Sequence, residues 1–278
     1  MNLFNKTFAA LELIGLLSLE VHKDIPPYPD RLQARISQEL IIKNNNLDKY
    51  AVLVKGDNQK IYNQNFSSIY NVLIENGFKS ENIYVFVHDG GNSVKQFNHP
   101  VDDVSSKESL EMILNHLAKK IDKNDIFLLY LSDHGGRESV KSPYENQIVE
   151  VSRFFLRGGD INELELEKAL KPIYAKNKIL AFDFCYDGGF ADRLGKNNDI
   201  AVSSSLYNRV SHAPNLDSFN VYFFQAFRDI CDSDYNNDKR VSIDEAYRYA
   251  IENYSLAKKG VDRPQLVSKI DVRNISLR

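Results

Sequence analysis

The chain has 278 residues, a length that fits one large α/β domain with an appendage. Hydrophobic residues make up 43% and charged residues 26%, with only 8 Pro and 13 Gly, which excludes collagen-like and wholly disordered proteins. The formal charge of -3 creates no field that would hold a phosphate backbone, so no nucleic-acid partner is expected.

Residues 1–48 are expected to form a helical N-terminal appendage. Apolar residues recur three and four positions apart between Leu3 and Val21, which predicts an amphipathic helix. The most apolar stretch, Phe8 to Leu19, contains Glu12 and is too short to span a bilayer, so no membrane partner is expected. Prolines then stop helical structure, and a second helix is predicted from Arg31 to Lys43, before a run of asparagines.

The rest of the chain, residues 49–278, has the pattern of an α/β domain. Short apolar runs alternate with helix-length segments, which predicts a mostly parallel sheet with helices on both faces. Five strands are predicted, over residues 50–54, 82–87, 125–131, 178–183 and 199–203. Capping boxes predict helix starts at Ser105 with Glu108 and at Asp160 with Glu163. Two extended runs in residues 140–156 predict a hairpin inserted after the third strand.

Two of the predicted strands end in reactive residues. The strand at 125–131 leads into Ser-Asp-His-Gly-Gly, which contains His134, and the strand at 178–183 leads into the loop that contains Cys185. Carboxyl ends of neighbouring parallel strands form a ligand crevice, so the two residues are expected to meet there. An imidazole can activate a thiol and later protonate a leaving amine, and the amides of Gly135 and Cys185 could stabilise an oxyanion. This chemistry is acyl transfer.

Other interpretations of these residues are simpler. A buried cysteine can act as a small hydrophobe, and a loop histidine can be hydrogen-bonded in a turn. The presence of His134 and Cys185 at the ends of consecutive strands favours catalysis, and His88, after another strand, is the rival histidine. The second cysteine, Cys231, is expected to be a packed thiol. Two cysteines are too few for a disulfide-stapled secreted domain, so a cytoplasmic location is expected.

These blocks resemble a known family. A hydrophobic strand ending in Ser-Asp-His-Gly, followed about 50 residues later by one ending in Asp-x-Cys-x-x-Gly, is similar to the caspase-like superfamily of cysteine peptidases, nearest its legumain-type branch and related bacterial proteins. The resemblance runs from about residue 50 to about residue 266. It implies a caspase-like three-layer sandwich and a cysteine endopeptidase with Cys185 as nucleophile, His134 as catalytic histidine, and Gly135 with Cys185 as oxyanion donors.

The same resemblance implies no cofactor for catalysis and a polypeptide substrate, with an activating or inhibitory protein as a further partner. The caspase signature Gln-Ala-Cys is absent, and Asp187 stands where legumain-type enzymes usually carry Ser. Tyr186 stands where legumain has an acidic residue of its asparagine pocket, so neither aspartate nor asparagine preference is implied. The segment after the fifth strand resembles a pocket-forming segment. Ser203 and Ser211 are expected to line that pocket with Tyr186, or else to be ordinary strand-end and turn serines.

Residues 234–245 have the spacing of an EF-hand calcium loop, with oxygen-bearing side chains at positions 1, 3, 5, 9 and 12. The expected ligand positions are Asp234, Asn236, Asp238, Arg240, Ser242 and Glu245. Lys239 stands where Gly normally permits the sharp turn, and its charge opposes a cation. The sequence allows either a structural Ca²⁺ site or a polar turn that caps the following helix without metal.

Three alternatives to peptide hydrolysis remain open. An amine could intercept the acyl-enzyme, which would make the protein a transpeptidase or transamidase. Asp187 could repel a thiolate and leave a catalytically silent binding module. The loop at 234–245 could make the protein calcium-responsive. The appendage could also act as an inhibitory segment, with the polar connector at 44–49 as its cleavage site, because exposed connectors are where chains are cut.

Overall fold

The computed structural model describes residues 31–39, 46–57, 61–90, 99–142, 147–197, 199–212 and 217–278. The helix predicted between Leu3 and Val21 lies outside these residues, as does the end of the helix predicted to reach Lys43. Within the described ranges, no helix combines the length and the apolar character that a membrane crossing requires.

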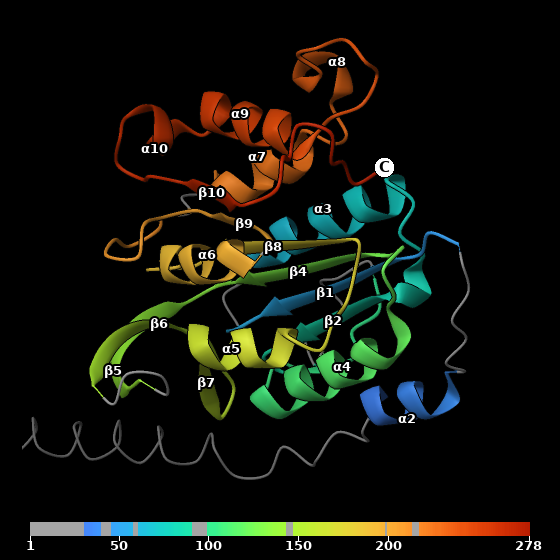
Figure 1. Cartoon of the computed structure of the whole chain (residues 1–278), viewed down its shortest axis with the longest axis vertical. Coiled ribbons are helices and arrows are strands. Elements are labelled where there is room, and N and C mark those ends of the chain that lie inside the picture. Colours follow the sequence, from blue (N-terminus) through green and yellow to red (C-terminus); the bar gives the residue numbers. More distant parts are fainter. Residues whose placement is uncertain are drawn as a thin grey trace, which may run out of the picture.

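A seven-stranded sheet forms the centre of the protein, in the order β10-β9-β8-β4-β1-β2-β3 (Figure 1). Its strands are β1 (Lys49–Lys55), β2 (Ile83–Val87), β3 (Asp103–Val104), β4 (Ile126–Ser132), β8 (Asn177–Asp183), β9 (Ile200–Ser203) and β10 (Gln265–Ser268). All neighbours are parallel except β10, which runs antiparallel to β9. The five predicted strands are confirmed, each within one residue at either end. Their continuous apolar sequences reflect burial on both faces, as parallel sheets require.

Helices cover both faces of the sheet (Figure 1). The helices are α2 (Arg31–Gln38), α3 (Ile61–Glu75), α4 (Lys107–Lys120), α5 (Glu163–Leu170), α6 (Gly188–Leu194), α7 (Phe219–Gln225), α8 (Ile230–Ser233), α9 (Ile243–Asn253) and α10 (Ser255–Lys258). Two buried hydrophobic clusters result. One contains residues of α3, α7 and α9, and the other contains residues of α2, α4, α5 and α6. Because side chains alternate along a strand, Leu53 joins the first cluster and Val52 the second. The predicted three-layer α/β architecture is confirmed.

Two predicted helix caps were wrong by one or two residues. Helix α4 is capped by Ser106, whose side chain accepts from the Ser109 amide, and not by Ser105. Helix α5 is capped by Asn162 in a capping box with Glu165, whereas Asp160 lies in the preceding strand. Neighbouring residues of similar chemistry compete for the cap, and the point where the extended chain ends decides which of them is used.

A second, antiparallel sheet has the order β5-β6-β7 and contains the predicted hairpin. Its strands are β5 (Gly135–Lys141), β6 (Ile148–Leu156) and β7 (Gly159–Asn162). The hairpin begins earlier than predicted, because β5 starts at Gly135, directly after His134. The antiparallel sheet therefore begins directly after the carboxyl end of β4, with only Asp133 and His134 between the two strands.

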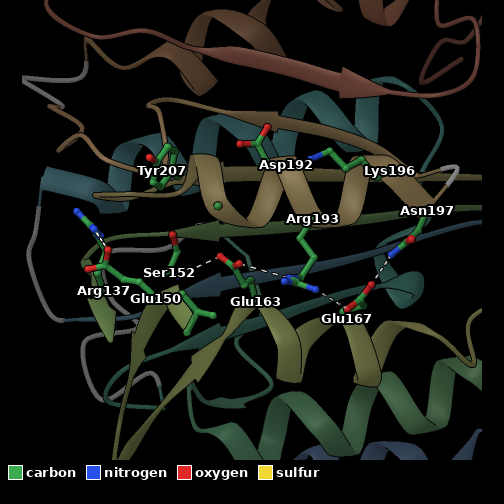
Figure 2. A pocket seen from close by; sticks show the side chains of 12 residues that line it. Arg137, Glu150, Ser152, Glu163, Glu167, Asp192, Arg193, Lys196, Asn197 and Tyr207 are labelled. Atoms are coloured by element: carbon green, nitrogen blue, oxygen red, sulfur yellow. Dashed lines mark hydrogen bonds and ion pairs between the residues drawn. The ribbon is translucent and has the colours of Figure 1, made fainter. Parts of the chain in front are cut away.

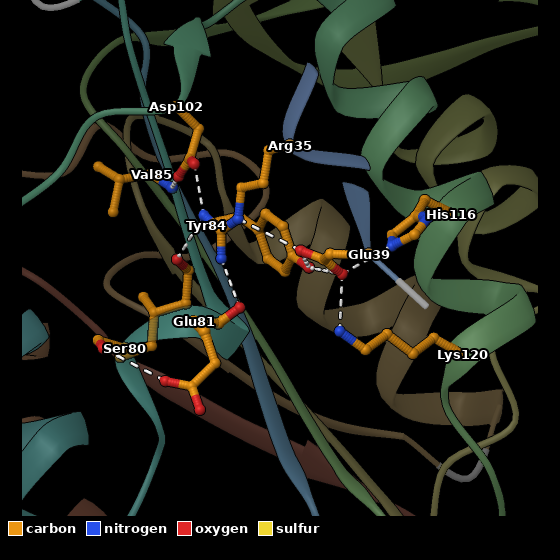
Figure 3. Close-up of polar contacts among 10 residues, drawn as sticks. Arg35, Glu39, Ser80, Glu81, Tyr84, Val85, Asp102, His116 and Lys120 are labelled. Atoms are coloured by element: carbon orange, nitrogen blue, oxygen red, sulfur yellow. Dashed lines mark hydrogen bonds and ion pairs between the residues drawn. The ribbon is translucent and has the colours of Figure 1, made fainter. Parts of the chain in front are cut away.

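Helix α2 is anchored to the amino end of β2 (Figure 3). The guanidinium of Arg35 donates to the carbonyl oxygens of Ile83 and Glu81 and pairs with the Asp102 carboxylate. It also lies over the Tyr84 ring, 3.9 Å from the centroid. The amino ends of parallel strands lie opposite their carboxyl ends, so α2 packs at the end of the sheet away from His134 and Cys185.

Glu39 completes this anchor (Figure 3). Its carboxylate accepts from the Tyr84 hydroxyl at 2.7 Å and from the Lys120 ammonium at 2.7 Å, and it lies 3.1 Å from His116 Nε2. Burial opposes ionisation of Glu39, but these hydrogen bonds outweigh it and lower its pKa to about 2. The division of the chain at residue 48 stays a prediction, and α2 belongs structurally to the face of the sheet that carries α4.

Candidate active site

The pairing of β4 with β8 brings the two predicted catalytic residues to one edge of the sheet. Ser132 pairs with Asp183 at the carboxyl ends of the two strands, and His134 and Cys185 each follow two residues later. Gly135 lies against the nucleophile loop, because a Cβ atom there would be 2.6 Å from the carbonyl oxygen of Cys185. Only glycine allows this close approach. His134 and Cys185 thus follow the carboxyl ends of neighbouring parallel strands, as predicted.

His134 faces two carboxylates. Its side chain is 42% exposed, and its Nε2 lies 3.8 Å from Asp57 Oδ2 and 3.7 Å from Asp133 Oδ1. Asp133 is fully buried, which raises the pKa of its carboxyl to about 6 although the Lys55 ammonium at 3.9 Å favours the ionised form. The amide of Asp57 donates to Asp133 Oδ2 at 2.9 Å, which fixes that carboxylate.

Asp57 and Asp133 were missed as site residues by the sequence analysis. Asp57 follows the carboxyl end of β1, the strand beside β4, so the strand-end rule that located His134 also applies to it. Within the described ranges, Asp57, Asp133 and His134 form the one set of three His, Cys, Asp or Glu side chains whose ligand atoms lie within 4.8 Å of one another. These are also the described residues best placed to hold a divalent cation.

Cys185 lies in a turn with a strained backbone. Its Sγ donates to the carbonyl oxygen of Ser211 at 3.6 Å. The next residue, Tyr186, has φ of 68°, a left-handed conformation that is uncommon for a residue with a side chain. The Tyr186 amide donates to Arg209 O at 2.8 Å, and its carbonyl accepts from Ser152 Oγ at 2.7 Å. These bonds hold the turn that presents the thiol.

The surroundings of Cys185 disfavour its thiolate. Partial burial raises its pKa, and the carboxylates of Asp187, Asp262 and Asp183 raise it further by repelling a thiolate. Cys231 is also a free thiol but is exposed, so the prediction that it is packed was wrong. His88 follows β2, which is separated from β8 by β1 and β4, so the rival histidine lies further along the sheet from Cys185.

The three predicted pocket residues occupy different environments. Tyr186 lines a cavity of about 430 Å³ together with Arg209, His212 and residues 260–261. The Ser211 carbonyl accepts from the Cys185 thiol, as described above. Ser203 is fully buried, and its hydroxyl donates to Ser205 O at 3.0 Å, as an ordinary strand-end serine does.

A second cavity, of about 410 Å³, opens between the hairpin and helices α5 and α6 (Figure 2). Three glutamates that line it are paired with two arginines. Arg193 reaches Glu163 at 3.3 Å and Glu167 at 3.2 Å across the cavity. Glu163 also accepts from the Ser152 amide at 3.0 Å. Since Ser152 Oγ binds the Tyr186 carbonyl, this cavity borders the nucleophile turn.

Comparison with known families decides the class of the protein. The family model described as the Peptidase C13 family matches residues 112–262, which is more than half of the chain. The chain belongs to the Peptidase C13 family. The match contains both His134 and Cys185. This membership confirms the legumain-type resemblance and indicates a cysteine-peptidase type of function.

A solved structure has a similar fold. Protein GSU0716 from Geobacter sulfurreducens has a similar structure, with a TM-score of 0.55 and 13% sequence identity. The similarity covers 82% of this chain and 97% of that chain. No curated protein matches the chain.

The loop at 234–245 lies inside the Peptidase C13 match and caps helix α9. Ser242 and Glu245 form a capping box, and Glu245 Oε1 also accepts from the Asn236 amide at 3.1 Å. Asp234 accepts from the amides of Asp238 at 3.2 Å and Lys239 at 2.8 Å.

Other bonds close the same loop. Asn236 Oδ1 accepts from the Asp238 amide, and Asp238 Oδ1 accepts from the Arg240 amide. Lys239 has φ of 67°, so the sharp turn forms without glycine. The helix-capping role is therefore present in the structure, and calcium binding stays a prediction.

Proposed function

We propose that this Peptidase C13 protein is a cysteine endopeptidase that hydrolyses peptide bonds through an acyl-enzyme on Cys185. The observation that carries the proposal is the register of β4 and β8, which places His134 and Cys185 at the same two-residue offset beyond a paired position. Family membership supports the same chemistry. A polypeptide is the substrate class that this function requires.

The first half of the reaction would acylate the thiol. Because the pKa of Cys185 is raised, His134 acts as a general base and removes the thiol proton as sulfur attacks the scissile carbonyl. The amides of Gly135 and Cys185 donate to the oxyanion of the tetrahedral intermediate. The imidazolium then gives its proton to the leaving amine, the carbon–nitrogen bond breaks, and a thioester remains on Cys185.

The second half would release the product. His134 takes a proton from a water molecule that attacks the thioester carbonyl, and the returning proton restores the thiol as the new carboxylate leaves. In both halves a positive charge appears on the imidazole. Asp57 and Asp133, both within 4 Å of His134 Nε2, stabilise that charge.

One observation favours a second candidate function, a catalytically silent binding module. Three carboxylates, those of Asp187, Asp262 and Asp183, disfavour the thiolate of Cys185. If His134 does not compensate for them, the thiol is inert and the crevice serves only to bind a polypeptide. Reactivity of the thiol separates the two functions.

The test measures cleavage of a fluorogenic peptide library by wild type, Cys185→Ala and His134→Ala. Cys231→Ala and His88→Ala are matched controls, because each removes the same chemical group away from the proposed dyad. A general base contributes at least about 100-fold to rate, so turnover should fall by that factor or more in the first two variants and stay unchanged in the controls. Product analysis with an added amine nucleophile distinguishes hydrolysis from transamidation.

Thiol alkylation decides the outcome if no peptide is cleaved. Labelling of Cys185 by iodoacetamide that depends on His134 would indicate an activated nucleophile whose substrate lies outside the library. Labelling that is indifferent to His134→Ala would refute the peptidase and support the binding module.

A further inference from the structure

Asp187 follows the nucleophile by two residues, and its carboxylate is completely buried. In the part of the chain that the structure describes, no Lys, Arg or His forms an ion pair with it. Its oxygens instead accept five hydrogen bonds. The donors are the Phe184 amide (3.3 Å), the Ser204 amide (2.9 Å) and hydroxyl (2.7 Å), and the Ser205 amide (2.9 Å) and hydroxyl (2.7 Å).

These bonds join two segments of the candidate site. Phe184 belongs to the nucleophile turn, whereas Ser204 and Ser205 begin the segment that follows β9. Ser204 Oγ also lies 2.7 Å from Ser211 Oγ, and the Ser211 carbonyl accepts from the Cys185 thiol. A closed ring of contacts therefore runs from Cys185 through Ser211, Ser204 and Asp187 back to the nucleophile turn.

We propose that Asp187 is a positioning residue, which holds the Cys185 turn against the segment of residues 204–211 so that the nucleophile and its substrate-facing wall keep one geometry. This inference rests on the proposed function, because positioning matters where Cys185 attacks a bound peptide. Asp187 itself touches no reacting atom. It acts through the backbone of Phe184 and through the serines.

A carboxylate suits this role better than a hydroxyl does. A carboxylate offers about four lone-pair directions for incoming donors, whereas a serine hydroxyl accepts fewer bonds and uses its own proton as a donor. Asp187 occupies the N-cap position of α6 but makes no side-chain cap there, so its acceptors are directed to Ser204 and Ser205 instead. Legumain-type enzymes usually carry Ser at this position. The carboxylate of Asp187 can instead accept hydrogen bonds from both Ser204 and Ser205, the two serines after β9.

The neighbouring backbone also needs restraint. Tyr186, between Cys185 and Asp187, has left-handed φ, and such residues persist when surrounding contacts fix them. Gly188, next in the chain, leaves no room for a side chain against residues Leu206 and Tyr207. The segment after β9 therefore packs directly on the start of α6, and Asp187 is the polar link inside this contact.

The positioning role has a signature that a loss of stability does not share. Burial raises the pKa of the Asp187 carboxyl to about 7, so above this pH Asp187 is ionised. There its carboxylate, together with burial and the carboxylates of Asp183 and Asp262, raises the pKa of Cys185, and its neutralisation makes the thiol easier to ionise. Asp187→Asn should therefore leave Cys185 alkylation unchanged or faster. It should at the same time slow peptide turnover. The NH2 group of asparagine cannot accept the hydrogen bonds that a carboxylate oxygen accepts, so the ring of contacts is broken.

The experiment compares wild type, Asp187→Asn and the matched control Asp192→Asn, which changes an acid on the cavity side of α6. Four quantities are measured: kcat and KM on a peptide that wild type cleaves, the rate of iodoacetamide alkylation of the Cys185 peptide by mass spectrometry, and Tm. Exposed Cys231 is an internal reference for alkylation. We expect Asp187→Asn to lose at least tenfold in kcat/KM, with Cys185 alkylation not reduced and Asp192→Asn unaffected.

Turnover of folded Asp187→Asn within twofold of wild type would overturn the inference, as would Cys185 alkylation that falls in proportion to turnover. If Asp187→Asn does not fold, Ser204→Ala removes the hydroxyl that links Asp187 to Ser211, and the same criteria apply to it. If wild type cleaves no peptide, the proposed function fails, and this inference, which rests on it, fails with it. If wild type cleaves the peptide and Cys185→Ala does not, the proposed function stands, and full turnover by folded Asp187→Asn refutes this inference alone.

Discussion

His134 Nε2 lies 3.7 Å from Oδ1 of Asp133, the residue that precedes it in the chain. Asp133 adopts φ of 138°, a conformation that residues with side chains rarely adopt. Its second oxygen accepts from the Asp57 amide at 2.9 Å. The strained turn therefore aims a buried carboxylate at the imidazole, where a positive charge would develop during the proposed reaction.

Asp133→Asn should lower kcat by about 10- to 100-fold, because a buried charge at this distance stabilises the imidazolium more than an exposed one does. Asp57→Asn should have a smaller effect, since its side chain is 44% exposed and water screens it. Steady-state kinetics on both variants, with Tm measured to confirm folding, test this order. Equal losses in the two variants, or a larger loss for Asp57→Asn, would contradict it.

The sequence was sufficient to place His134 and Cys185 after the carboxyl ends of neighbouring strands. The apolar runs before His134 and Cys185 are too short for helices and have no polar face, so they indicate buried parallel strands, and neighbouring strands along the chain are usually neighbours in space. Helix caps were less predictable, because Ser105 and Ser106 are chemically equal. There the backbone conformation decides which serine is the cap.

The environment of Asp187 could not be predicted from the sequence. A carboxylate two residues after a nucleophile suggests repulsion, and the structure indeed shows that it raises the pKa of Cys185. Its partner Ser204, however, is 17 residues away, and the contact exists only because β9 pairs with β8. Likewise, Arg35 and Asp102 meet over 67 residues. Long-range polar contacts of this kind leave no periodic pattern in a sequence.

Deletion of residues 1–48 should destabilise the protein. It removes fully buried Leu32 and leaves Tyr84, His116 and Lys120 without the Glu39 carboxylate. The lost burial and charged hydrogen bonds should cost about 3 kcal/mol or more in the free energy of unfolding. Urea unfolding of this deletion, of a deletion of residues 1–30 as control, and of the full chain tests the expectation. A separable appendage would instead leave stability unchanged in both deletions.

Glu39 should make the stability of the full chain sensitive to acid. Its pKa is lowered to about 2 in the folded protein from an ordinary value of 4.5. The stabilisation is therefore complete above pH 4.5 and is lost as the pH falls towards 2. Glu39→Gln should lie below wild type in Tm at pH 6, and the difference should shrink at pH 3. A difference that stays constant between these pH values would show that the ionised carboxylate is not what stabilises α2.

Calcium should raise Tm if the loop at 234–245 also binds metal. The turn geometry is present, but the charge of Lys239 opposes a cation, so the expected affinity is weak, in the range of about 10⁻⁴ to 10⁻³ M. Thermal unfolding is measured with millimolar Ca²⁺, with Mg²⁺, and with chelator. Asp238→Ala should abolish the shift, and Asp244→Ala, which replaces an acid outside the predicted ligand positions, should retain it. A wild-type Tm identical in Ca²⁺ and chelator would leave helix capping as the function of the loop.

Asp187 should give stability the opposite pH dependence. Burial raises the pKa of its carboxyl to about 7 from 3.8, and the hydrogen bonds from Ser204 and Ser205 oppose this shift. Between about pH 4 and pH 7 the folded protein thus keeps a proton that the unfolded chain has lost, and stability falls as pH rises through this window. Asp187→Asn carries no such proton, so the free energy of unfolding of wild type relative to Asp187→Asn should decrease from pH 4.5 to pH 7.5.

Asp183, whose pKa burial raises to about 6, contributes in the same direction in both proteins and also raises the pKa of Asp187, so the comparison reports Asp187 together with its interaction with Asp183. Urea unfolding at several pH values measures the difference, with Asp192→Asn as control. If wild type instead gains stability over Asp187→Asn as pH rises, the five donors hold Asp187 as an anion throughout this range. The Asp187 carboxylate, which belongs to the ring that joins Cys185 to Ser204, would then be negatively charged at every pH at which the protein is folded.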